Sequence, residues 1–399
     1  MKTELKSTKA MKTLKELYSR LNTAKNFKEM YPHFDMDDSK IHVLYISPCM
    51  NETGYYRMIL PALELNRTNT HSAIIGHIHK WDFNKMFDDY DTPVDFRLVQ
   101  WADYVVIPAM LTDIGYIIKS MREINDDIEF VMDMDINYHE LPEYHPDYKK
   151  LSRELKDTLI DNLSKVDILT TPNNQILSFY HGLAQKHEDD FLLYFEHFPN
   201  LLSNFTFEEI TEIRRNATGK VRIGIILDPS QGNDLKTIEK PIISLLDKYK
   251  EKIEPVIFGW SKKIAEQYGI LKDLRISYEK PVPFHEYHSR LNSLAFDIGL
   301  LPLVDNSFNT SGKSFNRFLD FSANMIPVIA PNLLPFNKII KEGENGFIAS
   351  SEEEWFSKID QLISEEQIRK EMGNNAFKTV WENLSYTPKT IQRLRNIFI

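Results

Sequence analysis

The sequence predicts an α/β protein built from two mainly parallel sheets. Short runs rich in β-branched residues alternate with stretches long enough to form helices, and this alternation is typical of a parallel sheet. The alternation pauses near Pro199 and Asn200 and restarts at Lys220, within a chain of 399 residues that is long enough for two cores. We therefore expect two Rossmann-like, doubly wound domains, with a cleft between them lined by the loops at the carboxyl ends of the strands.

The first half contains five strand candidates, at residues 41–47, 72–78, 102–109, 128–135 and 166–173. The first of them leads into a loop with Gly54 and then into an amphipathic helix around residues 56–63, which completes one β-α unit. The second half repeats the pattern, with strand candidates at 220–227, 253–259, 275–280, 296–303 and 326–330. Three amphipathic segments follow without another strand, at 351–363, 366–384 and 390–398, and we expect them to pack back across the domains.

These patterns predict four parts of the chain. Residues 1–40 form a basic helical extension, 41–200 an amino-terminal domain, 201–380 a carboxyl-terminal domain, and 381–399 a helix that packs on the amino-terminal domain. The first thirty residues carry seven Lys and one Arg against three Glu. Their apolar residues at 14, 17, 18 and 21 predict an amphipathic helix that either touches an anionic membrane surface or packs on its own domain.

The composition limits the classes of function. The net charge of −10 argues against binding nucleic acid by bulk electrostatics, although a local basic groove stays compatible with it. Cys49 is the single cysteine, so neither a disulfide framework nor a zinc-ligand spacing is present. The sequence has no apolar run of membrane-spanning length and no apolar core of a signal peptide at its start. We therefore expect a cytoplasmic protein.

One short stretch, NTSGKSFNRF at 309–318, contains the Gly-Lys-Ser that ends a P-loop. A P-loop needs another glycine five positions earlier, where this chain has Ser307. The stretch lies between the apolar strand candidate at 296–303 and a helical pattern, so Ser314 is expected to cap a helix whose amino end, together with Lys313, suits a diphosphate. The alternative is an ordinary capped helix with a surface lysine.

The carboxyl-terminal half resembles the donor-binding domain of retaining glycosyltransferases with the GT-B architecture, of the glycosyl transferases group 1 kind. The resemblance is carried by FDIGLLPL, GKSFNRFLDFSANMIPVIAPN, IIKEGENGFIAS and the helical segments that follow, with FPN and RIGIILDPSQGNDLKTI before them. It implies a hexosyltransferase that moves a sugar from a nucleotide-sugar, such as a UDP- or GDP-sugar, to an acceptor hydroxyl with retention. It also implies that no cofactor and no divalent metal are required.

The resemblance assigns donor-binding roles residue by residue. Asp320 takes the position whose carboxylate accepts hydrogen bonds from the ribose, whereas Gly312 replaces a glutamate that would touch the sugar. Gln231 replaces a lysine that would bind the diphosphate, so Lys313 and the N–H groups from Ser314 onward are the expected substitute. The complete set of expected donor-binding residues is Gly232, Gly259, Phe284, Gly312, Lys313, Ser314, Asn316 and Asp320. For Gly232, a simple turn glycine is the alternative.

In the first half, NETGYYRMILP resembles the loop and helix that border the acceptor and the donor phosphates. The expected acceptor-side residues are Gly54, Tyr55, Arg57, Asp135 and Asn137, and Arg57 would donate to a phosphate or remain a surface arginine. Asp133 and Asp135 spell a D-x-D, which holds a metal in other glycosyltransferases. We favour instead a contact of Asp135, Asn137 and His139 with the acceptor. The expected catalytic set is Lys313, Arg57, Asp135 and His139.

Alternative functions stay open at this point. The acceptor is a glycan, a lipid-linked glycan, a protein or a hydroxylated DNA base, and the last would need a basic groove formed by Arg57, Lys80 and the amino-terminal lysines. A non-catalytic module that binds nucleotide-sugars is the alternative from another class. It is suggested by the missing glutamate and lysine of the family pattern.

Overall fold

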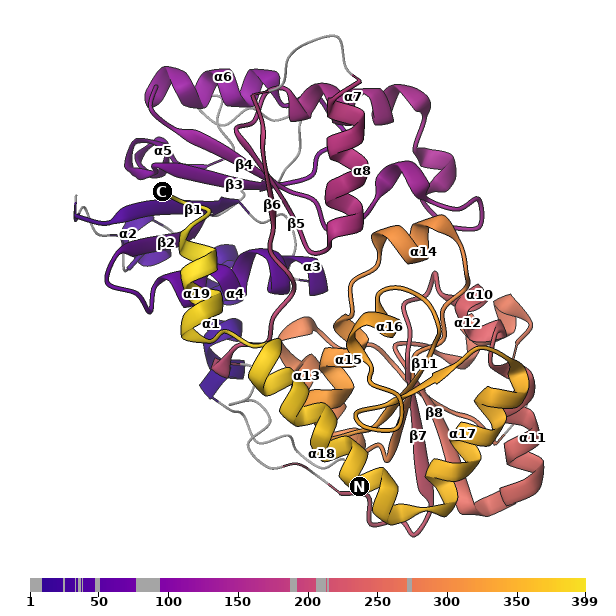
Figure 1. Cartoon of the computed structure of the whole chain (residues 1–399). Coiled ribbons are helices and arrows are strands. Elements are labelled where there is room, and N and C mark those ends of the chain that lie inside the picture. Colours follow the sequence, from indigo (N-terminus) through magenta and orange to yellow (C-terminus); the bar gives the residue numbers. More distant parts are fainter. Residues whose placement is uncertain are drawn as a thin grey trace. The chain divides into compact units, whose positions relative to one another are not determined.

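The computed structural model describes residues 9–23, 26–32, 34, 37, 39–46, 51–76, 94–186, 192–205, 213, 215–270 and 275–399. The chain divides into two compact units. The amino-terminal unit comprises Thr13–Ser203 and Tyr386–Ile399, and the carboxyl-terminal unit comprises Met1–Lys12 and Asn204–Ser385. Each unit contains one six-stranded parallel sheet with helices on both of its faces (Figure 1).

The sheet of the amino-terminal unit has the strand order β2-β1-β3-β4-β5-β6. All five predicted strands form, and every pairing in the sheet is parallel. The sixth strand, at the edge, was not predicted because its residues alternate between exposed and half-buried positions and lack an apolar run. The strands are β1 Ile41–Ile46, β2 His71–Gly76, β3 Tyr104–Pro108, β4 Glu129–Asp133, β5 Ile168–Thr171 and β6 Tyr194–His197.

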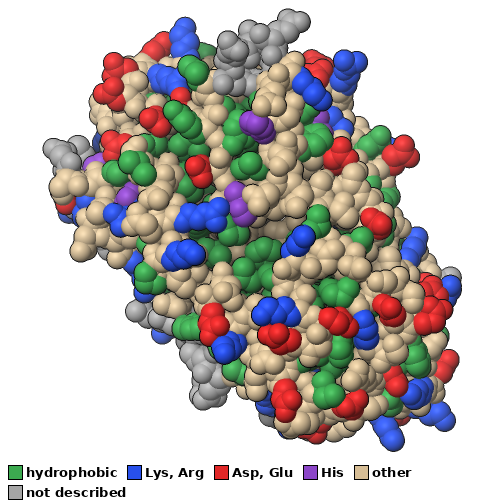
Figure 2. Space-filling model, viewed as in Figure 1, with side chains coloured by type: hydrophobic (Ala, Val, Ile, Leu, Met, Phe, Trp, Pro, Cys, Tyr) green, Lys and Arg blue, Asp and Glu red, His purple; other side chains and the backbone are tan. Residues whose placement is uncertain are grey.

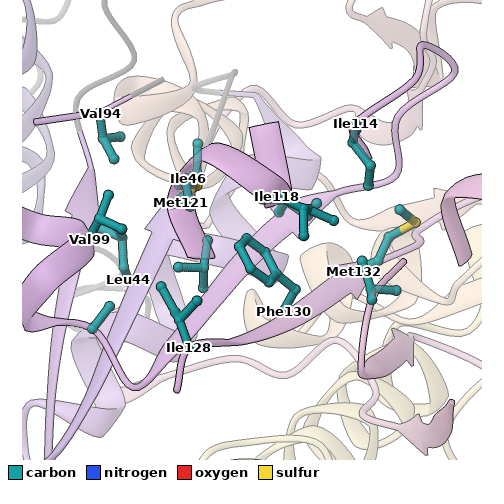
Figure 3. Packing of buried hydrophobic residues seen from close by; sticks show 14 of the residues in the cluster. Leu44, Ile46, Val94, Val99, Ile114, Ile118, Met121, Ile128, Phe130 and Met132 are labelled. Carbon is teal, nitrogen blue, oxygen red and sulfur yellow. The ribbon is translucent and has the colours of Figure 1, made fainter. Parts of the chain in front are cut away.

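Figure 3 shows the core of this unit, in which side chains of β1 and β4 pack against helix α6. Leu14 and Leu17 are buried as well, so these apolar positions of the basic helix α1 are covered by protein. The helices in this half are α1 Lys9–Thr23, α2 Phe27–Met30, α3 Glu52–Gly54, a π-helical turn Tyr55–Ile59, α4 Leu60–Leu65, α5 Phe96–Trp101, α6 Gly115–Ile124, the 3₁₀ turns Tyr138–Glu140 and Tyr148–Lys150, α7 Arg153–Leu163 and α8 Asn174–Ala184.

The last residues of the chain complete the amino-terminal unit. Helix α19 (Pro388–Arg395) begins with a capping box at Thr387 and packs against α4 (Figure 1). Beyond it, the Tyr104 hydroxyl donates to the Ile399 carbonyl at 2.8 Å, and the Phe398 ring packs edge-on against Tyr104 and Tyr45. Aromatic packing and hydrogen bonds therefore hold the chain end beside β1 and β3.

The sheet of the carboxyl-terminal unit has the order β12-β11-β10-β7-β8-β9, again parallel throughout. Counted from its own first strand, this is the 3-2-1-4-5-6 order of dinucleotide-binding folds. The predicted strands form, and the three-residue edge strand β12 is an addition. The strands are β7 Val221–Ile226, β8 Ile253–Phe258, β9 Ser277–Glu279, β10 Ile298–Leu300, β11 Val328–Pro331 and β12 Phe347–Ala349.

The helices of this unit follow from their caps and apolar faces. For example, the Ser351 hydroxyl caps α17, and glutamates fill its first turn, where the helix dipole favours negative charge. The helices are α10 Gly232–Lys236, α11 Glu239–Tyr249, the 3₁₀ turn Lys250–Lys252, α12 Lys262–Tyr268, α13 Phe284–Leu294, α14 Ser307–Gly312, α15 Asn316–Ala323, α16 Phe336–Ile339, α17 Glu352–Ser364 and α18 Glu366–Asn383.

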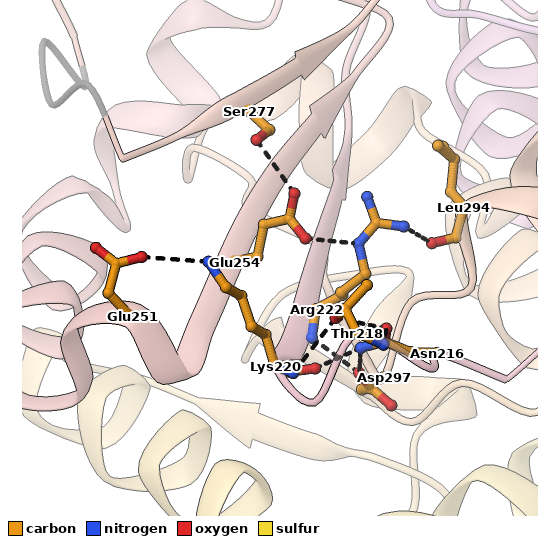
Figure 4. Close-up of polar contacts among 9 residues, drawn as sticks. All are labelled: Asn216, Thr218, Lys220, Arg222, Glu251, Glu254, Ser277, Leu294 and Asp297. Carbon is orange, nitrogen blue, oxygen red and sulfur yellow. Dashed lines mark hydrogen bonds and ion pairs between the residues drawn. The ribbon is translucent and has the colours of Figure 1, made fainter. Parts of the chain in front are cut away.

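A polar network ties together the amino ends of the strands in this sheet (Figure 4). The Asp297 carboxylate accepts from the Arg222 backbone N–H at 2.8 Å and from Asn216 Nδ2 at 2.9 Å. The Arg222 guanidinium in turn donates to Glu254 at 3.0 Å. Because these charges satisfy one another, the amino edge of the sheet is structural, and the carboxyl edge is the place to look for a ligand site.

Among the helices that the structure describes, none is long and apolar enough to cross a membrane. On the face shown in Figure 2, acidic and basic side chains are interspersed.

Candidate functional site

The topology of the carboxyl-terminal sheet selects one position for a ligand. Strands β7 and β10 are neighbours in the sheet, and the chain runs outward from them in opposite directions, which makes a topological switch point. Ligands of such sheets bind outside the carboxyl ends of the two strands. The segments that emerge there are the loop after β7, residues 227–231, and the segment after β10, residues 301–317.

The loop after β7 is fixed by its own side chains. Gln231 accepts from the Asp228 backbone N–H at 2.8 Å and donates to Asp234 at 3.2 Å, and Trp260 Nε1 donates to the Asp228 carbonyl at 2.8 Å. Gln231, which replaces the expected lysine, therefore shapes the loop. The Asp228 side chain is 63% exposed at the tip of this loop.

Asp234 joins this loop to the segment after β10. Its buried carboxylate accepts from the Val304 backbone N–H at 2.9 Å and from Asn309 Nδ2 at 3.2 Å. Lys313 Nζ lies 3.9 Å from the same carboxylate, and its side chain is 28% exposed. Lys313 is thus placed at the predicted edge of the sheet, where it forms an ion pair with Asp234.

The helix that was predicted to begin at Ser314 is divided in the structure. Helix α14 ends at the buried Gly312, and α15 starts at Asn316 with Phe315 in the cap position and no side-chain cap. The prediction that Ser314 caps this helix is wrong, because its hydroxyl donates to the Asn316 side chain at 2.8 Å. The amino end of α15 nevertheless begins beside Lys313.

Arg317, in the first turn of α15, is a candidate that the sequence analysis missed. Its Nη1 donates to the Tyr287 hydroxyl and to Asp320, both at 3.1 Å, and its Nη2 lies 3.5 Å from Asp228. The side chain is 17% exposed. The signal in the sequence is an arginine three residues before Asp320, on a helix whose other residues between them, Phe318 and Leu319, are apolar.

Asp320 has a different environment from the one predicted. It is 1% exposed, and its Oδ2 accepts from the Tyr287 hydroxyl at 2.7 Å as well as from Arg317. The Tyr287 ring is stacked between the rings of Phe258 and Phe284, with centroids 5.6 and 5.2 Å away. The predicted contact of Asp320 with ribose hydroxyls stays a prediction, in which the ribose would share the carboxylate with Tyr287 and Arg317.

Neighbouring protein atoms explain two of the three glycines that were expected near the donor. A Cβ at Gly232 would lie 2.2 Å from the Tyr268 ring, which is stacked on Trp260. Gly259 directly follows β8 and has a φ of +103°, and a Cβ at this position would lie 2.2 Å from the Leu227 carbonyl oxygen. For Gly232 the structural alternative describes the contacts better than an open approach to a ligand. Phe284 begins α13 and is half-buried in the aromatic stack.

In the amino-terminal unit, Arg57 belongs to a buried ion pair. Its Nη2 donates to Asp133 at 2.6 Å, and its Nη1 donates to the Phe198 carbonyl at 2.6 Å and to Asn200 at 3.0 Å. Burial opposes the charge, yet the Asp133 carboxylate outweighs it and raises the pKa of Arg57. This arrangement revises the predicted phosphate contact, because the guanidinium is 4% exposed and its donors are engaged inside the protein.

The residues beside Arg57 have packing roles. Tyr55 is fully buried and meets Tyr56 edge-on, so it belongs to the core and is not presented to an acceptor. Gly54 is buried at the end of α3, where its N–H donates to the Asn51 side chain at 3.0 Å. The Asp133 carboxylate also accepts from the Thr170 hydroxyl at 2.6 Å, so an arginine and a threonine already bind the first carboxylate of the D-x-D.

The other acceptor-side candidates follow the carboxyl end of β4. Asp135 lies beyond the strand and accepts from the Thr53 hydroxyl at 2.5 Å, and burial together with the charge of Asp133 raises its pKa. Asn137 is fully buried; its Oδ1 accepts from the His139 backbone N–H at 3.1 Å, whereas its Nδ2 has no partner among the described residues.

His139 completes this group. Its Nδ1 lies 3.1 Å from the Tyr180 hydroxyl, and burial, followed by the charge of Lys156, lowers its pKa. The imidazole is therefore neutral at pH 7. Lys80 and Cys49, which were also named from the sequence, lie outside the described residues.

Comparison with known proteins identifies the fold but not a family. No family model matches the chain, and no curated protein matches its sequence. Among solved structures, sucrose-phosphate synthase from Thermosynechococcus elongatus superposes with a TM-score of 0.57 and 8% identity, over 90% of this chain and 98% of that chain. The Anabaena protein HepE, solved in complex with UDP, gives 0.56 and 11% over the same shares of the two chains.

The longer structure of Staphylococcus aureus TarM matches with a TM-score of 0.48 and 12% identity. The match covers 77% of this chain but only 59% of the TarM chain. The likeness over nearly the full chain to the two shorter proteins confirms the predicted architecture: the chain has the two-domain α/β fold called GT-B.

Proposed function

We propose that this protein is a glycosyltransferase that moves a sugar from a nucleotide-sugar to an acceptor hydroxyl. One observation carries the proposal. At the switch point between β7 and β10, the chain places Lys313 beside the amino end of α15, and Arg317 extends from the first turn of that helix. Positive side chains and a helix amino end at such a position suit the diphosphate of a nucleotide-sugar.

The fold supports this choice of ligand. The HepE structure, which shares the GT-B fold, was solved with UDP. In the proposed reaction, the bond between the anomeric carbon and the diphosphate breaks, and a bond from that carbon to the acceptor oxygen forms. The proton of the acceptor hydroxyl passes to the departing phosphate. Retention of configuration and a cytoplasmic location are part of the proposal.

Lys313 and the first turn of α15 would stabilise the negative charge that develops on the leaving diphosphate. Fixed charges and N–H dipoles do this at little reorganisation cost, because they are already oriented before the reaction begins. Arg57 has no role in this step, since its guanidinium is buried against Asp133.

On the acceptor side, the Nδ2 of Asn137, which has no hydrogen-bond partner among the described residues, favours a role for this residue. A buried N–H group without an acceptor costs about 1–3 kcal/mol, so a hydroxyl that accepts from it would gain that energy. Asp135, with its raised pKa, lies two residues away and would orient the same hydroxyl. We keep these residues as the proposed acceptor contacts, with glycans, lipid-linked glycans, proteins and hydroxylated bases as the acceptor classes to be tested.

A non-catalytic nucleotide-sugar-binding module is the second candidate. Two observations favour it: Gly312 offers no carboxylate to the sugar, and the carboxylate of Asp320 is already used by Tyr287 and Arg317. A binding module and an enzyme differ in turnover, because only the enzyme hydrolyses or transfers the sugar of a bound donor.

The experiment that tests the proposal is a thermal-shift and hydrolysis screen with UDP-, GDP-, ADP- and dTDP-sugars. An enzyme raises its melting temperature with one of these donors and slowly releases the free nucleotide. Lys313→Ala should then weaken donor binding roughly ten- to hundred-fold, which is typical of a lost charged hydrogen bond.

Lys248→Ala is the matched control, because Lys248 also pairs with an aspartate, Asp360, but lies at the far end of α11. If the Lys313 variant binds and turns over the donor as well as wild type does, Lys313 is not the phosphate ligand. Binding without turnover by the wild-type protein would select the non-catalytic module.

A further inference from the structure

The charges at the carboxyl edge of the second sheet do not favour an anion as they stand. Three carboxylates, Asp228, Asp234 and Asp320, surround two cations, Lys313 and Arg317. A diphosphate would add further negative charge to a group that already has an excess of it. One of the carboxylates therefore has to leave its cation when a phosphate arrives.

The contacts identify which carboxylate leaves. Asp234 and Asp320 are 4% and 1% exposed, and hydrogen bonds from several donors hold each of them. Asp228 differs in both respects. Its side chain is 63% exposed, and its oxygen lies 3.5 Å from Arg317 Nη2, which is longer than a well-formed hydrogen bond. An exposed pair of this kind contributes little, so a ligand can replace it easily.

The second terminal nitrogen of the Arg317 guanidinium, Nη1, is held more firmly. Nη1 of Arg317 is within 3.1 Å of both the Tyr287 hydroxyl and Asp320, and the stack of Phe258, Tyr287 and Phe284 holds the tyrosine. The guanidinium is thus oriented by the buried Asp320 and the half-buried Tyr287, while Nη2 faces an exposed and replaceable partner. This geometry suits bidentate recognition of a phosphate, for which arginine is better shaped than lysine.

We propose that Arg317 is a phosphate-binding residue of this site and that Asp228 is an internal competitor, which occupies the arginine until a diphosphate displaces it. The inference rests on the proposed function, because it names the group that binds the donor diphosphate. It also explains how a loop with an aspartate at its tip can border an anion site. Asp228 sets a threshold: only a ligand with more than one charged oxygen at this point competes well with it.

The test is calorimetric titration of the full chain with UDP, with UMP and with inorganic pyrophosphate. Asp228→Asn should bind UDP about two- to five-fold more tightly than wild type, which is the range expected when an exposed ion pair no longer competes. Arg317→Ala should bind UDP at least about ten-fold more weakly, and Arg317→Lys should lie between the two. UMP binds more weakly, but it has to displace the same aspartate, so the Asp228 variant should gain by a similar factor for UMP as for UDP.

The controls are Asp247→Asn and Arg275→Ala. This arginine and aspartate also form a surface pair, with a distance of 2.9 Å, at the amino edge of the same sheet. Both controls should bind UDP as wild type does. Tighter binding by Asp228→Asn cannot result from damage to the fold, so this variant keeps the test decisive if Arg317→Ala is unstable.

The outcomes separate the two proposals. If wild type binds UDP and the Asp228 variant binds it no more tightly, the displacement is wrong although the donor site stands. If pyrophosphate follows the expected order of variants but neither UDP nor any nucleotide-sugar binds, the phosphate site stands and the proposed function fails. If neither UDP nor pyrophosphate binds, both proposals are overturned.

Discussion

Replacing Arg57 with methionine should lower the free energy of unfolding of the amino-terminal unit by about 5 kcal/mol, through the loss of buried contacts that the structure defines. Among the described residues, the variant leaves the buried Asp133 carboxylate with the Thr170 hydroxyl as its one side-chain donor, and an uncompensated buried charge costs about 3–5 kcal/mol. The Phe198 carbonyl and the Asn200 side chain each lose a donor, at about 1 kcal/mol apiece. A domain is typically stable by only about 5–15 kcal/mol, so this loss is large.

Hydrogen exchange measured by mass spectrometry is the suitable assay, because it reports each unit separately. Peptides from β1, β4 and β5 should lose protection in Arg57→Met, whereas peptides from β7 and β8 should not change. Asp133→Asn should have a similar effect. The double variant should cost at least about 2 kcal/mol less than the sum of the single ones, because it leaves no unpaired charge.

Arg122→Ala is the matched control in the same unit. Arg122 pairs with Asp167 at 3.0 Å, but both side chains are more than one-third exposed, at 39% and 34%. Its loss should cost less than about 1 kcal/mol. The reasoning is refuted if Arg57→Met keeps the protection pattern of Arg122→Ala, since the buried charge would then not matter to the fold.

Three further predictions concern single side chains. Asp135→Asn should raise the urea midpoint at pH 7, because burial raises the pKa of Asp135 and makes its charge costly; the gain should shrink as the pH falls from that raised pKa to the ordinary value of 3.8 and be absent below it, and an unchanged gain would count against it. Burial, assisted by the charge of Arg317, lowers the pKa of His288 from 6.5 to about 3, so the protein loses stability as the pH falls below 6.5. Between pH 7.5 and 4.5 the wild type should lose up to about 3 kcal/mol of unfolding free energy that His288→Gln does not lose. Gly232→Ala should destabilise the carboxyl-terminal unit by about 1–3 kcal/mol, read from its thermal melt, because the new methyl meets the Tyr268 ring; a neutral effect would mean that the ring moves freely.

Much of the fold could be predicted from the sequence because parallel strands are buried on both faces and therefore appear as apolar runs. The strands at 41–46 and 221–226 are of this kind. The two strands that were missed are edge strands, β6 and β12. β6 alternates exposed and half-buried residues, and β12 has only three residues, so neither leaves a clear pattern.

The site was predicted less well because its contacts join residues that are distant in the sequence. The position of Lys313 after β10 could be predicted, since a Gly-Lys-Ser between a strand and a helix is a local signal, and its role as a donor ligand stays a prediction. The burial of Arg57 could not be foreseen, because its partner Asp133 is 76 positions away. The cap at Ser314 was predicted wrongly because residues 307–312 have the composition of a loop but form helix α14. The next helix therefore starts later, at Asn316.

The return of the chain end to the amino-terminal unit has a consequence for biosynthesis. The first sheet is translated early, yet α19 and the Phe398 ring, which cover β1, β3 and α4, are translated only after the segment Asn204–Ser385 of the other unit. Domains made first usually fold first. Here the earlier unit has to wait, with an apolar surface uncovered, until residues 386–399 have been translated, and a stop near residue 385 would release a protein whose later unit is whole and whose earlier unit is not.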